Sequence, residues 1–262
     1  MGRITKYTGI TLVTLLIVFL CFIIQSEKHV IVMAMHPIIR EMENGIVAFQ
    51  VRNYSELETE NFIIRYGSIS KEALEKISYI SEEKYLEITK IFGASRKEKI
   101  VIVVHDDEES FNNLFLIRDN PLLGMYYGGA LHINGLNLIE KEWDFDTLWC
   151  LENTVLHEMV HLFTDHLGKG NFPAWFTEGV SLYFEYRING YEWGREVEVP
   201  RDEYTISKLQ HSFYELNQDI AYTQSFRLVK KFVDKKGVVS LVELISKLGD
   251  GEKLEKYYCL FE

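Results

Sequence analysis

Residues 157–178 read HEMVHLFTDHLGKGNFPAWFTE, and the fold of this stretch decides how the whole chain is interpreted. Apolar residues recur at helical spacing from Asp146 onwards, and Gly168 is a natural end for that helix. Pro173 suits the first turn of a second helix, which we expect to continue to about Tyr186. The sequence therefore predicts two consecutive helices joined by a short turn that contains glycine.

The first of these helices carries His157, Glu158 and His161. Residues four apart lie on one face of a helix, so both imidazoles can bind the same metal ion. Glu158 lies about 100° around the helix axis from His157, where it can serve as general base for an attacking water without binding the metal. Imidazole is the usual nitrogen ligand of zinc, so one Zn²⁺ ion is the expected cofactor.

A catalytic zinc ion typically has three protein ligands and one position for water, so a third ligand is required. Glu178 lies early in the second helix, and antiparallel packing of the two helices would bring it opposite the two histidines. Glu185 is the rival carboxylate, about two turns further along the same helix. We prefer Glu178 because it directly follows the return turn. The alternative to any metal site is a surface helix with two stray histidines.

Asp165 stands four residues after His161, where a carboxylate can orient a metal-binding imidazole. The alternative is a solvated charge at the end of the helix.

The N-terminus contains the apolar run GITLVTLLIVFLCFII, residues 9–24, which Arg3 and Lys6 precede. This pattern predicts one transmembrane helix with its N-terminus in the cytoplasm and the remainder outside. We expect an uncleaved signal anchor over residues 1–28, followed by a stalk over residues 29–46. A short leading helix in this region and a continuation of the membrane segment over residues 30–35 are the alternatives to a stalk. Cleavage and secretion is the alternative.

The rest of the chain, residues 47–262, is expected to form one domain. Strands dominate its first half and helices its second half, which indicates the α+β class. Two closing helices are expected near 218–236 and over 238–248. The other expected elements are strands at 47–51, 61–66 and 100–104, a strand with a bulge or exposed edge at 126–133, and helices at 71–92 and from Asp106 or Asp107 to about 117.

HEMVH followed by PAWFTEG resembles the HExxH…P-x-W-x-x-E-G pattern of gluzincin metallopeptidases, especially the peptidase MA-like group. The segment AYTQSFRLVKKFVDKKG, residues 221–237, is similar to the Tyr-x-Q-S helix of that group, and residues 207–213 resemble the stretch leading into it. The resemblance covers about residues 61–251. It implies a zincin-like domain in which a small mixed sheet packs on the active-site helix, with a mainly helical C-terminal lobe.

By this resemblance His157, His161 and Glu178 bind the metal, and Glu158 is the base. Tyr222 is similar to a tyrosine that donates a hydrogen bond to the oxyanion of the reaction, a charge that a phenol can stabilise. His211 is a weaker candidate for the same role. The aminopeptidase motif Gly-x-Met-x-Asn is not present before HEMVH, so the resemblance favours an endopeptidase over an aminopeptidase.

The whole sequence sets limits on function. Its net charge of −11 and the lack of a Lys/Arg cluster argue against nucleic acid as a partner. None of the three cysteines forms a CxxC pair, and a disulfide between Cys150 and Cys259 is one alternative to free thiols. The strand at residues 128–133 is a candidate edge for pairing with an extended peptide.

We therefore expect a zinc peptidase anchored in the cell membrane that acts on peptides or proteins outside the cytoplasm. The rivals are an extracellular zinc-binding module without peptidase activity, a surface protein without metal, and water attack on a different substrate.

Overall fold

The computed structural model describes residues 28–106, 111, 123–135, 143–199 and 204–262. Five strands form one sheet in the order β1-β2-β3-β5-β4. The three central strands are parallel, and each outer strand is antiparallel to its neighbour. The strands are β1 (Ser55–Glu58), β2 (Phe62–Tyr66), β3 (Ile100–His105), β4 (Gly124–Tyr127) and β5 (Ala130–Asn134).

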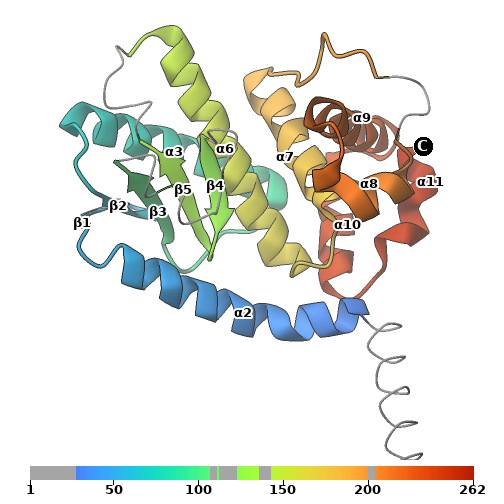
Figure 1. The fold of residues 1–262 in the computed structure, drawn as a ribbon, viewed down its shortest axis with the longest axis horizontal. Helices are drawn as coiled ribbons and strands as arrows, with labels where there is room; N and C mark the ends of the chain where they lie inside the picture. The colour runs from blue at the N-terminus through green and yellow to red at the C-terminus, as the bar shows by residue number, and fades with distance from the viewer. Residues whose placement is uncertain (1–27, 107–110, 112–122, 136–142, 200–203) are drawn as a thin grey trace, which may run out of the picture.

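Helices surround this sheet and build a separate lobe beside it (Figure 1). The α-helices are α2 (Lys28–Gln50), α3 (Lys71–Phe92), α6 (Phe145–Gly168), α7 (Ala174–Asn189), α8 (Ile206–Ser212), α9 (Gln218–Lys236), α10 (Val238–Gly249) and α11 (Tyr258–Phe261). Two short 3₁₀ helices, η1 (Phe213–Glu215) and η2 (Leu254–Tyr257), connect the last of them.

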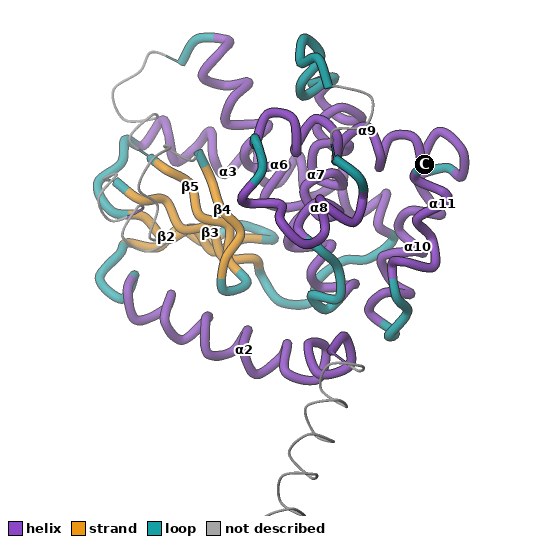
Figure 2. The backbone as a smooth tube through the Cα atoms, turned by 45° about the vertical axis from the view of Figure 1, so that its right-hand side comes forward, coloured by secondary structure: helices purple, strands orange, loops and turns teal. Residues whose placement is uncertain are grey.

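The helix α6 lies between the sheet and the helical lobe in both views of the molecule (Figures 1 and 2). One large core joins one face of the sheet to α3, α6, α7, α9 and α10. Alternation along β3 explains the layering, because Ile102 and Val104 point into this core while Val103 points to the other face. On that other face, Val47 and Val51 at the end of α2 cover Val103 and Ala130.

This architecture confirms a mixed α+β domain with a small sheet packed on α6 and a helical C-terminal lobe. The helix predicted at 71–92 has those bounds, with Ser70 as its N-cap and Gly93 in the left-handed conformation at its end. The helices predicted at 218–236 and 238–248 are also confirmed, the second of them one residue longer.

The strand predicted at residues 47–51 is wrong. These residues form the last turn of α2 and the turn after it. Val47 and Val51 are both buried, at 4% and 3% exposure, and they are four residues apart. That spacing matches one face of a helix, whereas a half-buried strand would alternate with a period of two. As a result α2 runs through the predicted stalk and packs directly on the sheet.

The single strand predicted at residues 126–133 is a hairpin in the structure. Gly128 and Gly129 both have positive φ, 57° and 72°, and form the tight turn between β4 and β5. The predicted edge at residues 128–133 is therefore misplaced, since β5 lies between β3 and β4. The outer strand of the sheet at this end is β4.

The predicted anchor at residues 1–28 lies outside the described residues apart from its last residue, and the helix predicted to reach residue 117 lies outside them apart from Asp106 and Phe111. None of the helices in the described ranges is both long and apolar enough to cross a bilayer. Cys150 and Cys259 are free and exposed, so the structure shows no disulfide between them.

Candidate metal centre and active site

The two helices predicted from residues 157–178 are α6 and α7. Asp144 caps the start of α6 by accepting a hydrogen bond from the backbone of Thr147 at 2.8 Å. Pro173, whose ring cannot continue a helix from the preceding turn, is the N-cap of α7 rather than its first residue. Later residues of α7 contact earlier residues of α6, so the helices are antiparallel as predicted.

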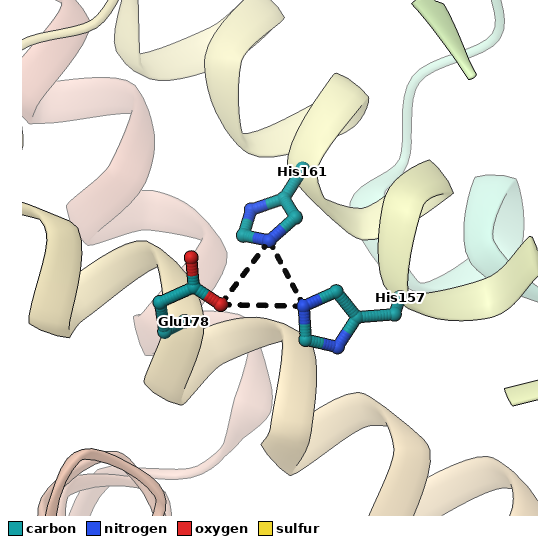
Figure 3. A group of neighbouring side chains, drawn as sticks. All are labelled: His157, His161 and Glu178. Carbon is teal, nitrogen blue, oxygen red and sulfur yellow. Dashed lines mark hydrogen bonds and ion pairs between the residues drawn. The ribbon is translucent and has the colours of Figure 1, made fainter. Parts of the chain in front are cut away.

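This packing brings His157, His161 and Glu178 together (Figure 3). The two Nε2 atoms lie 3.0 Å apart, and the Glu178 Oε2 atom lies 3.3 Å from His157 Nε2 and 3.5 Å from His161 Nε2. Tetrahedral ligands at zinc–nitrogen and zinc–oxygen distances of about 2.1 Å are separated from each other by about 3.4 Å. The three donor atoms therefore have both the chemistry and the spacing of a zinc site.

The outward nitrogen of each imidazole also has a partner. His157 Nδ1 lies 2.5 Å from Glu185 Oε1, and His161 Nδ1 lies 2.8 Å from Thr177 Oγ1. A carboxylate only accepts, so Glu185 holds a proton on His157 Nδ1 and leaves the Nε2 lone pair directed at the metal position. Glu185, the rival metal ligand in the sequence, thus contacts the back of a ligand instead.

The charges of this cluster reinforce one another. Burial opposes the charged form of His157, but hydrogen bonds with Glu178 and Glu185 outweigh it and raise the pKa of His157 well above its usual value, so a metal ion that binds here would displace the proton from Nε2. Burial likewise opposes ionisation of Glu178, but the two imidazoles lower its pKa far below the usual range. The pair of histidines therefore keeps Glu178 as a carboxylate, the form that binds a metal.

Glu158 lies beside this triangle, next to the outer strand of the sheet. Its side chain is buried, and burial raises its pKa above the usual 4.5. The backbone N–H of Tyr126 on β4 donates a hydrogen bond to Glu158. A Cβ on Gly124 would come within 3.1 Å of Glu158 Cγ and 2.5 Å of Thr154 Cγ2, so only glycine lets β4 lie this close to α6.

Tyr222 reaches the site from α9, which packs against α7. A Cβ on Gly179 would lie 2.5 Å from the Ser225 carbonyl oxygen, so this glycine sets how closely the two helices approach. Burial, and then the nearby Glu178 carboxylate, raise the pKa of Tyr222 well above 10, which keeps the phenol protonated. The Phe213 and Trp193 rings flank it at centroid distances of 5.3 and 6.0 Å.

The prediction that Asp165 orients His161 is wrong, because Thr177 occupies the Nδ1 side of that imidazole. Asp165 Oδ1 lies 2.9 Å from His36 Nε2, and Oδ2 accepts hydrogen bonds from Arg40 and Tyr126, each at 2.8 Å. The carboxylate lies one turn beyond His161 and faces α2. It fastens α2 and β4 to the end of the active-site helix.

His211 lies on α8 and is exposed, and its Nδ1 atom is 2.7 Å from the Ser207 carbonyl oxygen within the same helix. The described contact of the His211 imidazole is therefore with the backbone of its own helix.

Neither the contact of Thr177 with His161 nor the contact of Glu185 with His157 Nδ1 was predicted from the sequence. A signal for Glu185 existed, since it lies seven residues after Glu178 and therefore on the same face of α7. No local pattern pointed to Arg40 or His36, because they are separated from Asp165 by 125 and 129 residues.

A search of the curated proteins finds no match to this chain. A family model described as the Peptidase MA superfamily matches residues 82–259. That range contains α6, α7 and α9, and therefore His157, Glu158, His161, Glu178 and Tyr222. The match covers more than half of the chain and includes the whole metal centre, so the chain belongs to the Peptidase MA superfamily.

Proposed function

We propose that this protein is a zinc-dependent peptidase, acting as an endopeptidase, whose general base is Glu158. Membership of the Peptidase MA superfamily supports a metallopeptidase-like function in general. The observation that carries the finer proposal is the triangle of His157 Nε2, His161 Nε2 and Glu178 Oε2, with separations of 3.0 to 3.5 Å and Glu158 beside it. A zinc ion held by His157, His161 and Glu178 would lower the pKa of water and polarise a carbonyl group.

The outer edge of β4 is the proposed binding place for the substrate backbone. Asn134 N–H donates to the Leu123 carbonyl oxygen, which makes residues 123 and 134 a hydrogen-bonded pair in the antiparallel ladder. By alternation the backbone groups of Gly124 and Tyr126 then face away from β5. Because the Tyr126 N–H already donates to Glu158, an extended peptide would pair with the Gly124 N–H and with the carbonyl oxygens of Gly124 and Tyr126, and it would lie alongside Glu158.

In this arrangement Glu158 accepts a proton from the attacking water and passes it to the nitrogen of the leaving amine. The water oxygen forms a bond to the carbonyl carbon, and after the nitrogen is protonated the tetrahedral adduct collapses, so that the C–N bond breaks as the C=O bond re-forms. Release of the proton to the amine regenerates the Glu158 carboxylate. Tyr222 is protonated and donates a hydrogen bond to the carbonyl oxygen as negative charge develops there. His157 and His161 are held in position by Glu185 and Thr177 throughout.

We further propose that the apolar run at residues 9–24 anchors the protein in the cell membrane, with the catalytic domain outside the cytoplasm. The positive residues Arg3 and Lys6 before the run support this orientation. If the run is cleaved, the protein is secreted.

The test is the variant Glu158→Gln, assayed on a broad peptide library with metal content measured in the same preparation. We expect the zinc content to stay near one equivalent while hydrolysis falls by about 10³-fold or more, because a general base contributes roughly 10²–10⁴-fold. Glu152→Gln on the same helix is the matched control and should keep wild-type activity. Hydrolysis by Glu158→Gln at the wild-type rate would overturn the mechanism. A wild-type protein that binds zinc but cleaves no peptide would instead be a zinc-binding module.

A further inference from the structure

The helix α2 has its polar side turned towards the protein and its apolar side turned outwards. His36 and Arg40 contact Asp165 on α6, and Val47 packs on the sheet. Figure 2 shows α2 along the lower side of the molecule, below the strands of the sheet. Ordinary surface helices have the reverse arrangement, with the apolar stripe facing the core.

Exposed apolar side chains are concentrated on this helix. Of the fifteen large hydrophobic residues that are exposed among those described, nine lie on α2. Met42 and Phe49 are the most exposed of them, at 66% and 67%. Six follow helical spacing along the outer side: Ile31, Met35, Ile38, Met42, Ile46 and Phe49.

The width of this apolar stripe indicates whether a single partner helix or a broader apolar surface covers it. At about 100° per residue, the exposed apolar residues from Ile31 to Phe49 cover roughly 120° of the helix circumference, and between these two residues no charged side chain lies within that arc. The seam between two paired helices is narrower than this. A broad uncharged face therefore fits an extended apolar surface better than a single partner helix.

The preceding sequence indicates which surface this is. The apolar run at residues 9–24 ends four residues before α2 begins at Lys28. If that run lies in a membrane, as proposed above, the first turns of α2 emerge at the bilayer surface. α2 does not itself qualify as a span, because its inner side carries His36, Arg40 and Glu43. A helix with one polar and one apolar side lies in the plane of the interface.

We propose that α2 is an interfacial helix whose outer face lies in the headgroup region of the lipid bilayer. Its inner face would then hold the catalytic domain against the membrane through Asp165 and the sheet. His161 lies one turn from Asp165 on α6, so the metal centre would be about 10 Å above α2 and would act close to the membrane surface. This inference rests on the proposed anchor but not on the proposed chemistry.

The test measures the depth of nitroxide labels on the full chain in vesicles of phosphatidylethanolamine and phosphatidylglycerol. Native cysteines are first replaced by Cys21→Ala, Cys150→Ser and Cys259→Ser. Single labels are then placed through Met42→Cys and Phe49→Cys on α2. Matched labels at Tyr79→Cys and Leu86→Cys lie on α3, across the sheet from α2, at similar exposures of 69% and 54%.

We expect the ratio of collisions with oxygen to collisions with an aqueous nickel chelate to be about threefold or more higher at Met42 and Phe49 than at Tyr79 and Leu86. The reason is that the apolar face of an interfacial helix lies roughly 5–10 Å into the headgroup and acyl boundary.

Three outcomes would overturn the proposal. Equal ratios at all four labels in protein that floats with the vesicles would place α2 in water and leave only the anchor. Dipolar broadening between labels on α2, lost on dilution with unlabelled protein, would identify a second copy as the occupant. Failure of the full chain to float with the vesicles would exclude both the anchor and the interfacial helix, while the peptidase assay would be unaffected.

Discussion

Two clusters of polar side chains lie on α6, one turn apart, and they use nearly the same residue types. The metal centre combines His157 and His161 with the Glu178 carboxylate. The second cluster, which we call the α2 clamp, combines His36, Arg40 and Tyr126 with the Asp165 carboxylate. Each cluster therefore has a carboxylate and at least one imidazole on or against the same helix.

The clusters differ in what faces the carboxylate. In the α2 clamp, a guanidinium and a phenol donate directly to Asp165 Oδ2, so hydrogen-bond donors already occupy the oxygen that would otherwise face a cation. In the metal centre the hydrogen-bond partners Glu185 and Thr177 lie behind the imidazoles, Glu185 accepts from His157 Nδ1, and three lone pairs converge on the other side. Residue type alone does not make a metal site, and the direction of the lone pairs decides.

The largest effect should separate His157 from His36, which contact carboxylates in different clusters. His157→Ala removes one of three zinc ligands, so bound zinc should fall below about a tenth of an equivalent and hydrolysis should be lost, because three ligands are needed. His36→Ala should retain a full equivalent of zinc by metal analysis. If both variants lose zinc to the same extent, the α2 clamp is part of the metal site and the comparison fails.

Removal of the Tyr222 hydroxyl should have the next largest effect on the rate of hydrolysis. Tyr222→Phe should lower kcat by about 10²-fold with little change in KM or zinc content, because it removes a donor to developing charge. Since the pKa of Tyr222 is raised above 10, the donating form is present at all pH values below that point. The wild-type rate should therefore show no decline from this group between pH 7 and about 9. A loss confined to KM would exclude the oxyanion role.

A smaller effect on zinc affinity is expected for Glu185, which contacts the Nδ1 side of His157. Glu185→Gln keeps an oxygen acceptor for His157 Nδ1 but removes the charge, so zinc affinity should fall by about 10- to 100-fold. Competition with a chromophoric chelator measures this loss, and Glu192→Gln on the exposed loop after α7 serves as control. Unchanged affinity would mean that Glu185 contributes only to packing.

The smallest effect on the metal centre should come from the α2 clamp. Arg40→Ala leaves Asp165 with His36 and Tyr126 alone, so the free energy of unfolding should fall by about 1–3 kcal/mol with zinc content unchanged. Urea titration in mild detergent measures the change, and Arg52→Ala, an exposed arginine, is the control. A loss of zinc in Arg40→Ala would show that the clamp shapes the site.

The same contrast explains what could be predicted from the sequence. His157, His161 and Glu178 are linked by helical spacing and one short turn, so local periodicity was sufficient to bring them together. α3 was predicted to the residue for the same reason. The contact of Asp165 with Arg40 joins residues 125 positions apart, and no local pattern carries that information.

The errors at residues 47–51 and 126–133 have related causes. Short apolar runs suit either a strand or a helix end, and only the sheet beneath Val47 and Val51 selects the helix. Gly128 and Gly129 are compatible with either a bulge or a two-residue turn, and pairing with β3 selects the hairpin.

Gly179 directly follows Glu178 and contacts α9. The residue at this position therefore affects both the proposed metal site and the distance between α7 and α9. A chain that keeps HEMVH and Glu178 but carries a larger residue here would still hold zinc, while α9 and its tyrosine would be pushed away. Among related sequences, this single position would then mark which members are catalysts and which have become metal-binding proteins that no longer turn over a substrate.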